Sequence, residues 1–455
     1  MKRIATASAA AFIAFTTAAT PGRGDDLVGW RGDGTGVFET DARIVEWSRK
    51  SNALWTAKLP NWSNGMPVPT GDRVIVPSEE DRLLAVKMDD GTVLWNRGNG
   101  YDTLMNEKEV EAVKRCRKLI GAFHKWSDRI RKQPFDTNAV ARLESLCGEM
   151  RAWDGYAAAA ELSVRYSKPK INRGTGYSSA TPLTDGRHVW MIYGTGVAAC
   201  FDVEGNLKWR RMHQHPRVAD GLSASPVMAG GVLVLTVNDV LGVDPATGDE
   251  KWRAKTKPRH GTPAVVKCGN RLFVATANGE LIEASDGTVA ARKLGALTYG
   301  SPLAIGDTIY YVNGQHAWAR RVSVDAEGKV HVEQKWKTKV PKDRYYASPL
   351  VYKDRVYVIT QKGVLSVLKT DDGAVVYTKK VNPGGTVYAS PCCAAGPDLV
   401  YLTGESGRTV AIEAGDTFKV VGKNGLDKSK SSLFIAGDRL LARGGNRLFC
   451  IRATP

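Results

Sequence analysis

Cysteine is scarce and long apolar runs are absent from this chain of 455 residues. Its seven cysteines include no C-x-x-C pair and no C-x-x-C-H haem-attachment sequence. We therefore expect neither a disulfide-built scaffold nor a c-type haem protein. No stretch reaches the roughly 18 consecutive apolar residues that a membrane helix requires, so we expect a soluble mature chain without a transmembrane segment.

The N-terminus reads MKRIATASAAAFIAFTTAAT. Lys2 and Arg3 precede an uncharged, alanine-rich run from Ile4 to Ala19, and small residues follow it. This is the pattern of a secretory signal. We therefore assign residues 1–24 to a signal peptide and residues 25–455 to the folded protein, exported to the periplasm or the extracellular space.

Ser-Pro and Thr-Pro dipeptides recur along the chain with a regular period. They end at Pro182, Pro226, Pro263, Pro302, Pro349 and Pro391, at intervals of 37 to 47 residues. Pro67 lies 115 residues before Pro182, which becomes 41 when an insertion at 100–173 is removed. A period near 40 residues with several short β-runs in each unit predicts a β-propeller.

One unit shows the internal plan of the repeat. The segments 346–352, 355–361, 364–369 and 374–380 are apolar or alternating runs separated by tight turns, which predicts four strands, the content of one blade. Units of this kind start near residues 65, 177, 222, 260, 299, 346 and 388, and the tail 431–452 supplies three more strands. The segment 45–59 supplies the missing strand, because pairing the first strand with the last leaves no open sheet edge. The prediction is an all-β, eight-bladed propeller of four-stranded blades, which we expect to be a monomer.

The stretch YASPCCAAG at 388–396 holds two adjacent cysteines, which raises the question of a redox disulfide. In register with YASPLVYKD, Cys392 and Cys393 fall on Leu350 and Val351. Consecutive strand residues point to opposite faces, and buried cysteine behaves as a small apolar side chain. We therefore favour packing over a disulfide.

The insertion at 100–173 has a helical rather than a strand pattern. Val113, Ile120, Phe123 and Ile130 share one face, and Asn106 with Glu109 fits a capping arrangement. A second run follows Pro134, so we predict an antiparallel helical hairpin between blades 1 and 2. Cys116 and Cys147 would lie roughly 7 Å apart along the helix axes, which is poor geometry for a disulfide.

The ends of two units, LAVKMDDGTVLW (84–95) and LGVDPATGDEKW (241–252), resemble the pyrroloquinoline-quinone (PQQ) repeat, an Asp-x-x-x-Gly turn followed by a docking tryptophan. The opening WRGDGTGVF (30–38) also resembles secreted bacterial PQQ-like propellers. The family includes quinoprotein dehydrogenases, which use PQQ and calcium, and non-enzymatic members such as BamB. The resemblance implies docking roles for Trp55, Trp95, Trp209, Trp252 and Trp336, but leaves the function open.

Acidic residues are outnumbered, 47 against 64 Lys and Arg. The segments joining one blade to the next (210–221, 253–261, 292–299, 337–346, 378–388 and 419–432) hold 19 Lys/Arg and three acids. The turns between third and fourth strands hold 14 acids and one Lys. We therefore expect one basic face, which would attract an anionic partner, although Asp is also ordinary turn chemistry. The candidate partner-binding residues are Arg217, Lys255, Lys257, Arg259, His260, Lys342, Arg344, Lys428 and Lys430.

Two functions follow from these patterns. A dehydrogenase needs PQQ on a tryptophan platform, an aspartate base and a calcium held by about six to eight oxygens. The basic face offers few acids for such a cage, and Trp190 and Trp318 lie in β-runs where a core role is the commoner interpretation. We therefore favour a non-enzymatic binding or scaffold module without cofactor or metal, whose partner is an envelope protein or an anionic polysaccharide or lipid headgroup. Nucleic acid is not expected, since no stacking-aromatic motif is present.

Overall fold

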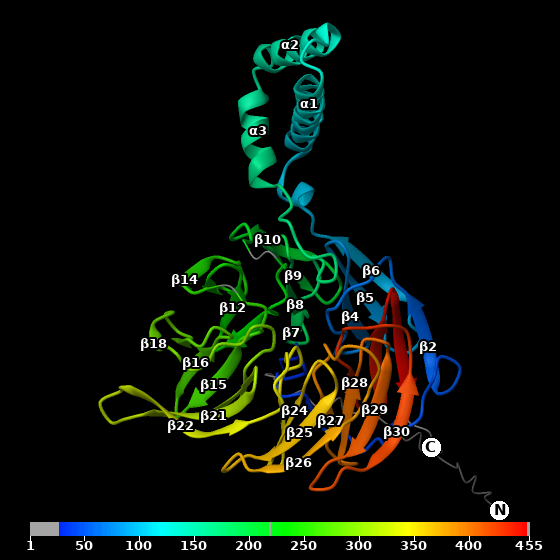
Figure 1. The fold of residues 1–455 in the computed structure, drawn as a ribbon, viewed down its shortest axis with the longest axis vertical. Helices are drawn as coiled ribbons and strands as arrows, with labels where there is room; N and C mark the ends of the chain where they lie inside the picture. Colours follow the sequence, from blue (N-terminus) through cyan, green and yellow to red (C-terminus); the bar gives the residue numbers. More distant parts are fainter. Residues whose placement is uncertain (1–26, 218–219, 258, 453–455) are drawn as a thin grey trace, which may run out of the picture.

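The computed structural model describes residues 27–217, 220–257 and 259–452. Within these residues, eight four-stranded sheets surround a central axis, and one of them gains a fifth strand (Figure 1). This confirms the predicted eight-bladed propeller. The predicted signal peptide at 1–24 lies outside the described residues. No helix among those described is long and apolar enough to cross a membrane.

Each blade has its innermost strand first, as the repeat plan predicts. The first four blades are β3 (Val68–Thr70), β4 (Arg73–Ser78), β5 (Arg82–Lys87) and β6 (Val93–Gly98); β7 (Leu183–Thr184), β8 (His188–Ile192), β9 (Val197–Asp202) and β10 (Leu207–Met212); β11 (Val227–Ala229), β12 (Val232–Thr236), β13 (Val240–Val243) and β14 (Glu250–Ala254); and β15 (Ala264–Cys268), β16 (Arg271–Ala275), β17 (Leu281–Glu283) and β18 (Val289–Ala291). The last four are β19 (Leu303–Ile305), β20 (Thr308–Asn313), β21 (His316–Val324) and β22 (Val330–Lys339); β23 (Leu350–Tyr352), β24 (Arg355–Ile359), β25 (Val364–Lys369) and β26 (Val375–Lys380); β27 (Cys392–Ala394), β28 (Leu399–Thr403), β29 (Arg408–Glu413) and β30 (Val420–Gly425); and β31 (Phe434–Ala436), β32 (Arg439–Gly444) and β33 (Arg447–Arg452) with β2 (Ala53–Lys58).

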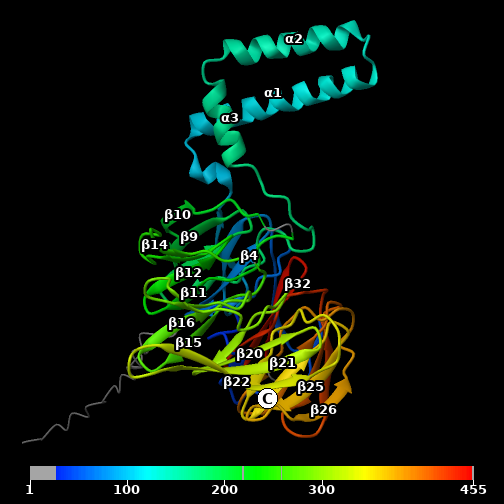
Figure 2. The same cartoon turned by 60° about the vertical axis from the view of Figure 1, so that its left-hand side comes forward.

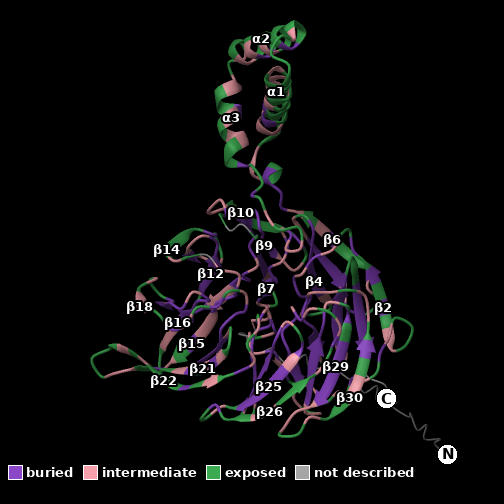
Figure 3. Cartoon of the chain, in the orientation of Figure 1, coloured by how far each residue is buried: buried purple, intermediate pink, exposed green. Residues whose placement is uncertain are grey.

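The middle strands are buried on both faces because every blade packs against two neighbours. All five residues of β12 and all four of β13 are buried, whereas the outer strand β14 alternates exposed and buried positions. Figure 3 shows the same gradient, with buried residues in the blades and exposed residues on the outer strands and the helices. The continuous apolar sequences of β12 and β13 are therefore explained by neighbouring blades that cover both faces of their sheet.

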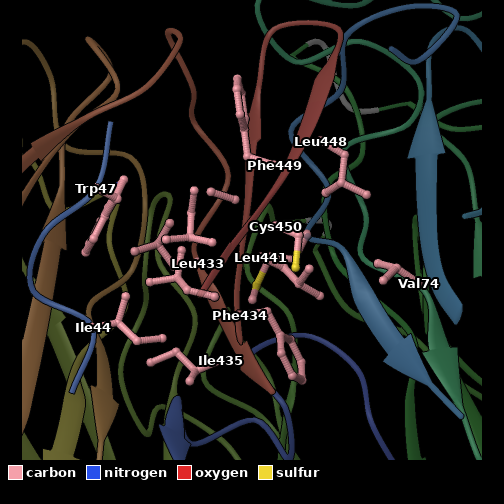
Figure 4. Close-up of a cluster of buried hydrophobic side chains, with 14 of the residues drawn as sticks. Ile44, Trp47, Val74, Leu433, Phe434, Ile435, Leu441, Leu448, Phe449 and Cys450 are labelled. Atoms are coloured by element: carbon pink, nitrogen blue, oxygen red, sulfur yellow. The ribbon is translucent and has the colours of Figure 1, made fainter. Parts of the chain in front are cut away.

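The ring closes by pairing the two ends of the chain. β2 pairs antiparallel with β33, placing Trp55 opposite Cys450, as predicted, although only Ala53–Lys58 of the predicted segment 45–59 is strand. Figure 4 shows the apolar cluster at this closure, where Phe434, Leu441, Phe449 and Cys450 are buried. Burial of this apolar cluster stabilises the pairing of β2 with β33 and so the closed ring.

Tryptophans on the outer strands contact the following blade. Each donates its indole N–H to a backbone carbonyl of the next blade: Trp55 to Met88 (2.8 Å), Trp95 to Val203 (2.9 Å), Trp209 to Pro245 (2.9 Å), Trp252 to Ala284 (3.0 Å) and Trp336 to Thr370 (2.9 Å). The turn glycine is needed for this approach. A Cβ on Gly248 would lie 2.6 Å from the Trp209 ring, and Gly248 has a φ of 74°.

The Ser/Thr-Pro markers form a hydrogen-bonded belt around the axis. The backbone N–H of each donates to the side-chain hydroxyl of the next: Met66 to Thr181 (3.1 Å), Thr181 to Ser225 (2.9 Å), Ser225 to Thr262 (3.0 Å), Thr262 to Ser301 (2.9 Å), Ser301 to Ser348 (2.9 Å), Ser348 to Ser390 (3.0 Å) and Ser390 to Ser432 (2.9 Å). Ser431 donates to the Gly65 carbonyl at 3.4 Å and completes the circle. The repeated YASP segment is therefore a junction between blades, and the innermost strand begins only after it.

The segment that precedes the first blade crosses one end of the central channel. β1 (Val37–Phe38) pairs in parallel with β27, as the fifth strand of the seventh blade. Arg31 is fully buried and donates to the carbonyls of Pro349 (2.8 Å) and Pro391 (3.0 Å). A Cβ on Gly36, whose φ is 79°, would lie 2.5 Å from the Arg31 guanidinium. The motif WRGDGTGVF thus brings a buried cation to the innermost strands.

The insertion forms an arm that stands away from the ring (Figure 2). After the short 3₁₀ turn Tyr101–Leu104, it comprises α1 (Glu107–Lys132), α2 (Thr137–Ala152) and α3 (Tyr156–Arg165). The predicted capping box of Asn106 and Glu109 is present. The predicted hairpin is wrong in one respect: its second limb is two helices, because the chain turns at Trp153–Gly155, and both pack on α1.

All seven cysteines carry free thiols. Cys392 and Cys393 lie in β27 and belong to different apolar clusters, on the two faces of the strand. Burial raises the pKa of Cys392 to about 12 and also raises the pKa of Cys393. The pair therefore packs as predicted from its register.

Candidate binding site at the mouth of the propeller

We call one end of the central channel the mouth. It is the end at which the outer strand of each blade connects to the innermost strand of the next blade. The residue three positions before each belt proline, or before Leu433 in blade 8, lies at this end. We call these eight residues the mouth ring: Asn64, Ser179, Ser223, His260, Tyr299, Tyr346, Tyr388 and Lys430. All eight line one pocket of about 400 Å³. The belt holds the backbone next to each of these residues. The same position of the repeat, taken once from each blade, therefore forms the ring of side chains around the pocket.

Aromatic side chains form one continuous arc of the mouth ring. The rings of His260 and Tyr299 stack with centroids 5.9 Å apart, followed by Tyr299 to Tyr346 at 4.6 Å and Tyr346 to Tyr388 at 4.7 Å. The Lys430 ammonium lies 4.6 Å from the Tyr388 ring centroid, within cation–π range. Four successive blades thus present aromatic groups that end at a cation.

The charges of the pocket are separated across it. Arg344 extends from the loop before blade 6, and its Nη1 lies 3.4 Å from the Tyr346 hydroxyl. Lys430 donates to the Gly174 carbonyl at 3.3 Å and lies 3.9 Å from Glu405. Asp220 lines the side near His260, with 3.8 Å between its carboxylate and the imidazole. Burial lowers the pKa of His260, although Asp220 opposes this, so the imidazole stays largely neutral near neutral pH.

The chain that returns from the arm forms one wall of the pocket, which sequence reasoning missed. The Asn64 amide donates to the carbonyls of Gly174 (3.0 Å) and Thr175 (3.2 Å). Glu79 anchors the same segment by accepting from the N–H groups of Tyr177 (2.9 Å) and Ser178 (2.7 Å). Burial raises the pKa of Glu79 despite these hydrogen bonds. The helical arm is therefore joined directly to the mouth.

The predicted basic residues divide into two groups. His260, Arg344 and Lys430 line the pocket. The rest lie on the surrounding loops, exposed except for the half-buried Arg259: Arg217, Lys255, Lys257, Arg259, Lys342 and Lys428. Several cations assigned to these loops by sequence belong instead to outer strands, such as Arg253 in β14, which pairs with Glu250 at 2.6 Å. The mouth is therefore less charged than the loop counts indicate.

The side chains at the mouth fit calcium and PQQ poorly. Asp220 is the single acid among the described lining residues, joined by the amides of Asn64 and Asn172, whereas calcium prefers about six to eight oxygens. Within the described ranges, no group of three or more His, Cys, Asp or Glu could hold a metal ion. Trp190 and Trp318 do not line the pocket and donate instead to backbone carbonyls of Pro245 and Leu294.

Comparison with known proteins agrees with this architecture. The family model for the outer membrane protein assembly factor BamB matches residues 18–163, 236–320 and 319–455. The chain belongs to this family. No curated protein sequence matches the chain significantly.

Two solved structures share the fold of this BamB-family chain. BamB from Moraxella catarrhalis has a TM-score of 0.54 at 10% identity, covering 88% of this chain and 99% of that one. The quinohemoprotein alcohol dehydrogenase ADHIIG from Pseudomonas putida HK5 has a TM-score of 0.51 at 11% identity, covering 90% and 78%. At such identities the likeness concerns the fold alone, and one neighbour is an assembly factor while the other is an enzyme.

Proposed function

We propose that this BamB-family propeller is an exported, non-enzymatic binding module that engages a protein of the cell envelope at its mouth. The observation that carries the proposal is the mouth ring, in which the belt holds an arc of aromatic groups, Arg344 and Lys430 around one pocket. Aromatic and arginine side chains are the residue types enriched at protein interfaces. The basic loops around the pocket would steer an acidic partner toward it.

The charged side chains that line the pocket favour a binding function over dehydrogenase chemistry. Arg344 and Lys430 stand among the lining residues where a calcium site would need carboxylates, and neighbouring cations oppose a bound divalent cation. A PQQ-dependent dehydrogenase of alcohols or sugars is the alternative, since a quinohemoprotein alcohol dehydrogenase shares the fold. Stoichiometric PQQ uptake with Ca²⁺ by the purified protein, together with reduction of an artificial acceptor, would overturn the proposal.

A direct test measures retention of the mature protein on polyaspartate resin against salt. We expect retention that weakens as salt rises and that falls further when Lys255, Lys257 and Arg259 are changed to Glu. A matched triple change to Glu at Lys267, Lys329 and Lys353 removes the same charge and should leave more retention. These exposed residues lie toward the opposite face, Lys267 near the end of β15 and the other two on turns. Equal losses in the two variants would show that net charge, not this face, causes the retention.

The proposed location is the periplasm or the cell exterior. This proposal rests on the N-terminal sequence, which has the pattern of a secretory signal, and on the family, whose model describes the outer membrane protein assembly factor BamB. Fractionation of cells that express the complete chain should recover a shortened protein outside the cytoplasm. A full-length cytoplasmic protein would contradict this location. We also propose that the free protein is a monomer, which sedimentation can check.

A further inference from the structure

The mouth pocket is polarised, and the order of the blades defines the polarity. His260 belongs to blade 4 and Lys430 to blade 8, so they face each other across an eight-membered ring. Arg344 adds a second cation before blade 6, while Asp220 lies beside His260 on the far side. Asp220 is the one acid among the described lining residues, and Glu405, outside the lining, lies 3.9 Å from Lys430. The two lining cations therefore leave the blade 6–8 side of the pocket attractive to one negative charge.

Hydrogen-bonding capacity is also uneven around the pocket. On the side of blades 1 to 3, Ser223 donates to the His260 carbonyl at 3.0 Å, and Asn64 donates to the returning segment. On the opposite side, the Tyr346 hydroxyl accepts from Arg344, which leaves its own proton for a ligand. The phenols of Tyr299 and Tyr388 add further donors. A ligand here must supply acceptors, as a carboxylate does.

The geometry of the aromatic arc argues against two other ligands. Tyr346 has a neighbouring ring on each side, with centroids 4.6 and 4.7 Å away and planes tilted by 53° and 34°, so a ligand has little room to stack on it. Lys430 already lies against Tyr388. A sugar ring or a quaternary ammonium ion needs an open aromatic face, whereas ring edges carry positive potential and suit an anion.

We propose that the mouth pocket binds the terminal carboxylate of an acidic peptide segment of the partner protein, held by Arg344, Lys430 and the Tyr346 hydroxyl. This deepens the proposed function and rests on it. A volume of about 400 Å³ lies near the lower end of ligand pockets, so the pocket admits the end of a chain rather than a protein surface. Among the described lining residues, Arg344, Lys430 and Asp220 sum to one positive charge, which a monoanion balances and a doubly charged phosphate exceeds.

The test titrates the complete mature protein with a fluorescein-labelled hexapeptide that ends in Glu-Glu with a free carboxylate. Its controls are the same peptide amidated at the C-terminus and a Gln-Gln version. We expect anisotropy to show binding of the free acid, weakened by amidation. Arg344→Gln or Lys430→Gln should weaken it about tenfold or more, because each removes a charge-assisted hydrogen bond. Tyr346→Phe, which keeps the ring, should weaken it less, and Lys267→Gln on the opposite face should not change it.

The outcomes separate this proposal from the broader one. If polyaspartate retention depends on Lys255, Lys257 and Arg259 while no hexapeptide binds, the basic face binds a partner without using the pocket. If the hexapeptides bind equally, or the Arg344 and Lys430 variants bind normally, the carboxylate site is refuted. Tighter binding of oligogalacturonate, of anionic lipid vesicles or of PQQ than of the free-acid peptide would refute the ligand class.

Discussion

Removing one hydroxyl from the belt should weaken the junction between two blades. The Ser301 hydroxyl accepts the backbone N–H of Thr262 at 2.9 Å, and both residues are buried, with 5% and 3% of their surfaces exposed. Ser301→Ala leaves that N–H buried without an acceptor, which costs about 1–3 kcal/mol. Ser301→Thr keeps the hydroxyl, and threonine already occupies the belt in blades 2 and 4.

Two measurements report the loss of stability caused by Ser301→Ala. For a chain of this size, an unfolding entropy of about 2.1 cal/mol/K per residue converts ~1 kcal/mol into roughly 1 °C of Tm, so Ser301→Ala should lose about 1–3 °C. Hydrogen exchange at the Thr262 amide should accelerate by about 5- to 150-fold if the whole cost appears in local opening. The reasoning is refuted if alanine changes neither quantity, or if threonine is as destabilising as alanine.

Three further predictions follow from the docking turns, the mouth and the thiols. Gly248→Ala should lower Tm by several degrees, because its Cβ would meet a docked tryptophan at 2.6 Å, whereas Gly231→Ala, with a similar φ of 75° and open space, should cost only the backbone strain. Since burial lowers the pKa of His260 below its ordinary 6.5, the unfolded state binds more protons just below that pH. Stability should therefore fall on acidification from pH 7.5 to 5.5, and His260→Asn should flatten the urea-midpoint profile. Ellman titration of the unfolded, unreduced protein should count all seven thiols, whereas a count of five would mean that one pair of cysteines is joined.

The blade count and strand order were predictable because each blade repeats one local pattern. The belt prolines keep a period near 40 residues across the insertion, and the belt places a hydroxyl at one position in every blade except blade 1, where Met66 stands. The observed strand, Leu350–Tyr352, is shorter than the predicted strand 346–352. The residues before Leu350 form hydrogen bonds to the next blade and not to a strand of their own blade. Local periodicity reveals strands but not which partner a backbone group finds.

The mouth ring had a signal in the sequence that charge counting overlooked. His260, Tyr299, Tyr346 and Tyr388 all stand three residues before a belt proline. Aligning that register, rather than totalling Lys and Arg over loops, would have placed them together. Totals over loops mix mouth residues with outer-strand cations that pair locally, such as Arg253.

Other features depend on contacts that no local pattern encodes. Arg31 reaches carbonyls 318 and 360 residues away in the chain, so its burial follows only once the ring is closed. The wall formed by Gly174 and Thr175 likewise depends on how the arm returns to the propeller. The split of the second helical limb had a weak local sign, Asp154-Gly155, which the apolar spacing of Leu146 and Met150 outweighed.

The central claim, that the mouth is where a protein partner binds, is tested most directly by site-specific photocrosslinking in the native host. A crosslinking residue replaces the exposed Thr298, next to the mouth ring, and in a control replaces Lys267 on the opposite face. We predict one protein adduct from position 298 that disappears when Lys430→Gln is added, and none from position 267. Equal adducts at both positions, or no adduct at 298 in a protein that purifies with stoichiometric PQQ, would contradict the claim.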